Sequence, residues 1–103
     1  MRDEQLINGL QDERKKLASA LQQKGFGQIA ASLRSLDSSL SSVQLQLRAL
    51  SDENREKVKR VFENISSLAA QVPQVPQVPE ELKRAVVEIE KKIKSMLNSN
   101  KIP

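Results

Sequence analysis

The sequence contains no cysteine, histidine, tryptophan or tyrosine, and its aromatic side chains are Phe26 and Phe62. Without cysteine and histidine, the chain lacks disulfides, thiol nucleophiles, the commonest zinc ligands and a side chain that transfers protons near neutral pH. Its glycines form no phosphate-binding loop, because Gly25-Phe26-Gly27 is not followed by Lys and Ser or Thr. These absences predict a protein that is not an enzyme and that binds no metal or cofactor.

Apolar residues make up 38% of the 103 residues, which is enough for a modest core, so we expect a single domain spanning residues 1–103. The net charge is +4, and the basic residues are not concentrated in a tail. The first residues, Met1-Arg2-Asp3-Glu4, do not resemble a secretory signal, and no apolar run is long enough to span a bilayer. We therefore expect a cytoplasmic protein.

Apolar residues recur at alternating spacings of four and three in four segments, which predicts an all-α helical bundle or coiled coil. The clearest series lies in the second segment and consists of Ile29, Leu33, Leu36, Leu40, Val43, Leu47 and Leu50. We assign no acidic residue to a core position in any series, so a buried catalytic carboxylate is not expected. The predicted helices cover about 3–24, 28–50, 52–71 and 79–98. Within the single domain, residues 1–71 form a hairpin of the first two helices followed by a third helix. A C-terminal helix (80–98) and a frayed tail (99–103) come after the proline-rich segment.

Two boundaries have local signals. Gly25 follows the first segment and is predicted to adopt the left-handed conformation that ends a helix. Ser51 or Asp52 can cap a new helix, and the apolar series resumes one residue late at Val58, which favours a break at 50–52. Since no Gly or Pro occurs from 28 to 72, one long helix over 28–71 remains an alternative.

Residues 72–79 read Val-Pro-Gln-Val-Pro-Gln-Val-Pro, with proline at every third position. This spacing matches the threefold period of polyproline II and predicts a stiff, extended strap. Such a strap would carry the chain back along the bundle and let the third and fourth helices run parallel. The segment also contains P-x-x-P motifs, which resemble ligands of SH3-type domains. Because Glu80 and Glu81 follow it instead of a basic residue, we favour a linker.

The second helix has a further series opposite its apolar stripe, and this series is almost free of charge. We call this series, from Ala31 to Ala49, the serine face. Small residues there would let another helix approach closely, so we expect the second helix to lie centrally with neighbours on both sides. The alternative is a serine-rich face that is exposed to solvent. Phe26, between two glycines, either closes the helix end against the bundle or inserts into a partner. The predicted protein interface is Ala31, Ser35, Ser38, Ser42, Leu45, Ala49 and Phe26.

Basic residues in the last helix are the best candidate for nucleic-acid contact. Acidic residues stand four positions before many basic residues, so intrahelical pairing is the simpler interpretation, and no aromatic side chains are available to stack on bases. The candidate patch is Lys83, Arg84, Lys91, Lys92 and Lys94, and the expected pairs are Asp12–Lys16, Glu53–Lys57, Glu56–Arg60, Glu80–Arg84, Glu88–Lys92 and Glu90–Lys94.

The pattern as a whole favours a non-catalytic structural, assembly or adaptor protein that acts through helix–helix contacts. We expect self-association, with the protein itself or another protein as the partner and no small-molecule substrate. Two alternatives stay open: a small basic nucleic-acid-binding protein, and a regulatory inhibitor or chaperone that covers a partner protein.

Overall fold

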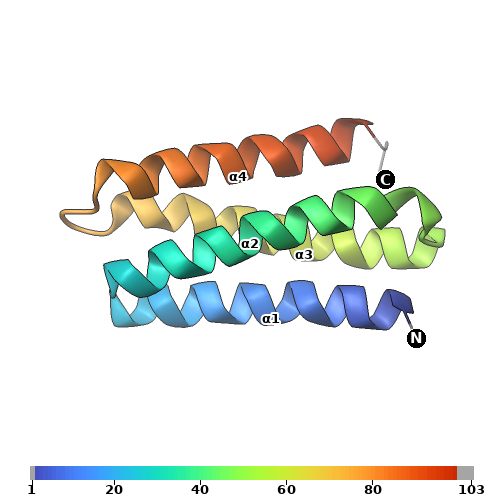
Figure 1. The fold of residues 1–103 in the computed structure, drawn as a ribbon, viewed down its shortest axis with the longest axis horizontal. Helices are drawn as coiled ribbons and strands as arrows, with labels where there is room; N and C mark the ends of the chain where they lie inside the picture. The colour runs from blue at the N-terminus through green and yellow to red at the C-terminus, as the bar shows by residue number, and fades with distance from the viewer. Residues whose placement is uncertain (1, 100–103) are drawn as a thin grey trace.

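The computed structural model describes residues 2–99, which fold into an all-α bundle of four helices (Figure 1). This confirms the predicted fold class, and the described residues contain no strand. None of the described helices is long and apolar enough to cross a membrane. The predicted tail lies mostly outside the described residues, since only Ser99 belongs to the last helix. The elements are α1 (Arg2–Gln23), α2 (Phe26–Gln46), the 3₁₀ turn η1 (Leu47–Ala49), α3 (Asp52–Gln71), the 3₁₀ turn η2 (Val72–Gln74) and α4 (Glu80–Ser99).

The four helices run up and down in sequence and occupy the corners of a square. α1 packs against α2 and α3, and α4 packs against the same two helices. The expectation that the second helix lies centrally is therefore wrong, because every helix has two principal neighbours. The bundle measures 41 × 25 × 18 Å, and α1 begins at the same end at which α4 finishes (Figure 1).

The apolar series of the four helices meet along the axis of the bundle. Every member of the series on α2 is buried, as are Phe62 and Ile65 of α3 and Ile89 and Ile93 of α4. Burial of apolar surface is the main source of folding free energy, so these seams hold the fold together. Phe62 has the largest side chain among those that are fully buried.

The predicted break near residues 50–52 is confirmed. After η1 the backbone of Leu50 is extended, and Ser51 caps α3 by accepting a hydrogen bond from the Asn54 amide at 3.2 Å. Leu47 and Leu50 are both buried and close this end of the core. The chain therefore turns here because a helix cap and two core leucines fix the corner, without Gly or Pro.

The turn between α1 and α2 differs from the expectation. The residue with the left-handed backbone is Lys24, with φ of 56°, and not Gly25. Gly25 is extended (φ −88°, ψ 108°) and forms the N-cap of α2, its carbonyl accepting from the Ile29 amide at 2.9 Å. Because α2 begins at Phe26, the chain has to reverse its direction at Lys24, one residue before the predicted position at Gly25.

Lys24→Gly is expected to raise the free energy of unfolding by about 1 kcal/mol, since a left-handed backbone costs a residue with a Cβ about 1–2 kcal/mol and glycine much less. Chemical denaturation with urea measures the change. The control is Lys15→Gly at an exposed position inside α1, which is expected to lower the same quantity by about 1 kcal/mol. Equal losses from both substitutions would contradict the role given to Lys24.

The predicted polyproline II strap at 72–79 is wrong. Val72–Gln74 continue α3 as a 3₁₀ turn, and Gln77 has a left-handed backbone with φ of 61°, so the chain reverses in a short loop. α3 and α4 are consequently antiparallel (Figure 1). A 3₁₀ helix also has three residues per turn, so proline at every third position fits both structures. Burial of Val72 in the core favours the compact one.

Candidate functional site

The serine face lies on the outside of the bundle. Leu45 is 88% exposed, whereas Ser35 is half-buried; Ala31, Ser38 and Ser42 are exposed. Among the described residues no helix covers this face apart from the contact of Ser35 with Glu13 of α1, because α1 and α4 pack against the core side of α2. The neighbour expected on this face is therefore not another helix of the bundle, and most of the face is exposed.

Two members of the predicted interface are placed differently from the rest. Ala49 is exposed but belongs to η1, beyond the last turn of α2, so it does not extend the face on α2. Phe26 is the first residue of α2, and its partly buried ring packs against the core cluster. Phe26 thus closes the corner of the bundle, which leaves Ala31 to Leu45 as the continuous part of the face.

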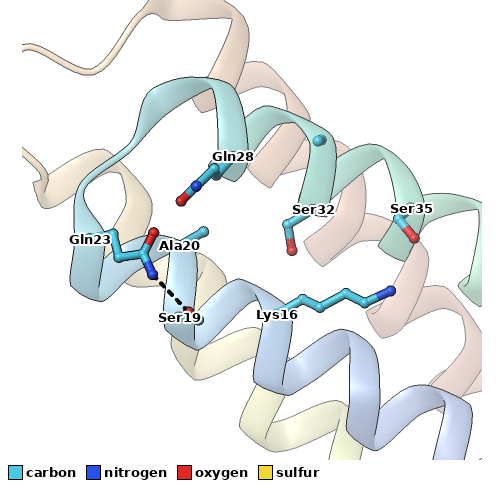
Figure 2. Close-up of a pocket in the computed structure, with 8 residues that line it drawn as sticks. Lys16, Ser19, Ala20, Gln23, Gln28, Ser32 and Ser35 are labelled. Carbon is cyan, nitrogen blue, oxygen red and sulfur yellow. Dashed lines mark hydrogen bonds between the residues drawn. The ribbon is translucent and has the colours of Figure 1, made fainter.

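A groove between α1 and α2 borders the serine face. It has a volume of about 450 Å³ and opens to solvent (Figure 2). Its walls are mostly small or polar side chains: Lys16, Ser19, Ala20 and Gln23 from α1, and Gln28, Ala31, Ser32 and Ser35 from α2. Figure 2 shows the Ser32 hydroxyl pointing from α2 toward α1. A second hollow along the same helix pair is lined by Gly9, Ser39 and Ser42, among others.

Glu13 lies between these two hollows and was missed by the sequence analysis. It is 8% exposed and occupies the core position midway between Leu10 and Leu17, so the expectation that no acid occupies a core position is wrong. Its Oε1 accepts a hydrogen bond from Ser35 Oγ at 2.8 Å, and Lys16 Nζ lies 3.8 Å from the same oxygen. Its Oε2 is buried without a partner. The sequence contained a signal for this position. Leu10 and Leu17 are seven residues apart, and a heptad series has one more core position within such a gap.

The basic residues of the predicted patch on α4 lie in different environments. Lys92 is half-buried and donates to Asp37 Oδ1 and to Ser41 Oγ, both at 2.8 Å, so it joins α4 to α2. Lys83 Nζ lies 3.9 Å from Glu80 Oε2. Lys83, Arg84, Lys91 and Lys94 are exposed, so four of the five members of the predicted patch remain on the surface.

Most of the predicted intrahelical ion pairs are not formed among the described side chains. Of the six expected pairs, Glu53–Lys57 is present, with Nζ and Oε1 3.9 Å apart. Lys16 pairs with Glu13 and Lys92 with Asp37 instead. Lys16 uses the i,i+3 spacing within α1 instead of the i,i+4 spacing to Asp12, whereas Lys92 pairs with an acid on a different helix, which a rule based on spacing along one helix does not include.

Within residues 2–99 the structure brings together no group of three acidic side chains that could hold a metal ion. The most distinctive surface is therefore the serine face with its adjoining groove. Comparisons with profiles of known protein families, with characterised proteins and with solved structures find no match to this chain.

Proposed function

We propose that this protein is a non-catalytic assembly or adaptor protein that self-associates through the serine face of α2. The observation that carries the proposal is the exposure of Leu45, at 88%, on a helix face otherwise made of small uncharged residues. Solvated helix faces usually carry Lys and Glu, which keep the surface polar and prevent association. An exposed leucine among alanines and serines supplies apolar surface that a contact with another molecule would bury.

The contact is expected to be weak. α2 has 21 residues and is therefore about 32 Å long, so one helix face buries an area at the lower end of the range for specific interfaces. We therefore expect monomers and oligomers to exchange at micromolar to millimolar concentration.

The test is light scattering of the wild-type chain and of the double variant Ser38→Lys/Ser42→Lys over that concentration range. The wild type is expected to gain mass with concentration, and the variant to stay monomeric, because two copies would bring four added positive charges together.

The matched control is Asn64→Lys/Ser67→Lys, which adds the same charges at exposed positions of α3 and is expected to behave as the wild type. Circular dichroism checks that all three chains are folded. A wild type that stays monomeric throughout would overturn the proposal.

Nucleic-acid binding through α4 has less support, because Lys92 is engaged with Asp37 and Ser41, and Lys83, one of the four exposed basic residues of the patch, lies 3.9 Å from Glu80. Binding of a different protein, as an inhibitor or chaperone would do, uses the same serine face. A folded, monomeric wild type that captures one specific protein through that face would favour this second interpretation over self-association.

A further inference from the structure

Leu45 and Ala31 lie at equal distances on either side of Ser38 along the serine face. Ala31 is seven residues before Ser38 and Leu45 is seven residues after it. Seven residues make two helical turns, so all three side chains share one face of α2. The face thus has its smallest apolar side chain at one end and its largest at the other.

Two antiparallel copies of α2, related by a twofold axis through Ser38, place Leu45 of each copy opposite Ala31 of the other. In such a pair, residues whose numbers add up to 76 lie at the same level, and each contact occurs twice. The pairing matches a large side chain with a small one at both ends and leaves Ser38 facing Ser38 at the centre. A parallel pair would instead place Leu45 against Leu45 and Ala31 against Ala31.

The groove between α1 and α2 lies at the position where Leu45 of the second copy arrives. Ala31 lines this groove together with Ala20 and Ser32, and its volume of about 450 Å³ leaves room for a leucine side chain (Figure 2). Entry of Leu45 would remove its exposed apolar surface from water in both copies at once.

Two buried polar atoms near the groove lack a hydrogen-bond partner among the described residues. They are Ser32 Oγ and Glu13 Oε2; Ser32 is 6% exposed and Glu13 is 8% exposed. Unsatisfied buried polar groups are rare in folded proteins and indicate a missing partner. In the antiparallel pair, Ser42 of the second copy arrives within one residue of Ser35, whose hydroxyl contacts Glu13. Ser42 therefore brings a second hydroxyl to the rim of the groove beside Ser35.

The charges on α2 are compatible with this arrangement. Arg34 lies level with Ser42 of the second copy, and Asp37 lies level with Ser39. No charged residue of α2 therefore meets its own symmetry mate, which would otherwise cause repulsion at a twofold contact.

We propose that two copies of this chain associate antiparallel about Ser38, with Leu45 of each copy inserted in the α1–α2 groove of the other. This inference rests on the proposed function and specifies its geometry. It makes the groove part of the interface, and it assigns Leu45 as the side chain that anchors the pair.

Single cysteines provide a direct test, because the natural chain contains none. Ser38→Cys is expected to form a disulfide-linked dimer upon mild oxidation. A mixture of Ala31→Cys and Leu45→Cys chains, one carrying a size tag, is expected to give the mixed dimer. Either variant alone is expected to form little disulfide-linked dimer, because the two identical cysteines of a pair would lie about 21 Å apart along the helices.

The outcomes are distinct. Efficient self-linking of Ala31→Cys and of Leu45→Cys would show a parallel pair and overturn this geometry while leaving self-association intact. No cross-link at any position, with light scattering still showing dimers, would show that the dimer uses another surface. A strictly monomeric wild type would overturn both the geometry and the proposed function.

Leu45→Ala gives an independent measurement by light scattering. Removing the anchor from both copies is expected to raise the dissociation constant at least about tenfold, because burial of one leucine side chain alone changes that constant by more than about tenfold. The control is Val87→Ala, which shortens the other large apolar side chain found exposed among those described, at 47%, on α4. Equal association of the Leu45→Ala variant and the wild type would overturn the anchoring role.

Discussion

Phe62→Ala is expected to lower the free energy of unfolding by about 3–5 kcal/mol, the largest effect of any single substitution considered for this chain. Phe62 is fully buried in α3 and has the largest side chain in the core. Truncation removes its transfer free energy and leaves a cavity that the surrounding helices fill only in part. Since small domains have a total stability of about 5–15 kcal/mol, a large fraction of the protein would unfold at moderate denaturant. Urea unfolding followed by circular dichroism measures the change.

Phe62→Leu serves as the control for the loss of volume. It keeps an apolar side chain in the core and is expected to cost clearly less than Phe62→Ala, because the remaining cavity is smaller. A loss of less than about 1 kcal/mol in the alanine variant would show that Phe62 is not packed in the core as described.

Glu13→Met is expected to affect stability in the opposite direction and to raise the free energy of unfolding of the monomer by about 1–3 kcal/mol. The carboxylate of Glu13 lies in the core seam between Leu10 and Leu17 with one oxygen unpartnered. A buried polar atom without a partner loses its hydration and gains nothing in return. Methionine is unbranched and flexible, so it can occupy the same space without a polar atom.

The comparison for this prediction is Asp12→Met, which replaces an exposed acid one residue earlier and is expected to change stability by less than about 0.5 kcal/mol. Urea unfolding at low micromolar concentration keeps the protein monomeric, so that the measurement reports on the chain alone. A destabilised Glu13→Met variant would show that the bond from Ser35 and the nearby Lys16 compensate the burial of the carboxylate.

Much of the fold could be predicted from the sequence, because the apolar residues repeat with the period of packed helices. The series on α2 is buried in full, and the slip in phase before Val58 marks the real corner at Ser51. The path from α3 to α4 could not be predicted. Proline at every third position is compatible with two helical geometries, and the choice depends on whether Val72 joins the core, which is a tertiary property.

The candidate site was predicted in part. The spacing of small residues identified the serine face, whereas the groove beside it depends on α1 lying next to α2 and has no signal within either helix. Glu13 was not predicted as a core residue, because core positions were assigned to apolar residue types alone. The acidic residue between Leu10 and Leu17 was therefore left out of the series. The partners of Lys92 were missed because Asp37 lies on a different helix.

The start of α1 and the finish of α4 lie at the same end of the bundle, and this placement has a consequence for the antiparallel pair (Figure 1). Each copy would direct its ends outward, opposite to those of the other copy. A domain fused to either end of the chain would then sit at both extremities of the dimer. The pair would act as a double-headed spacer that holds two attached domains at its opposite ends.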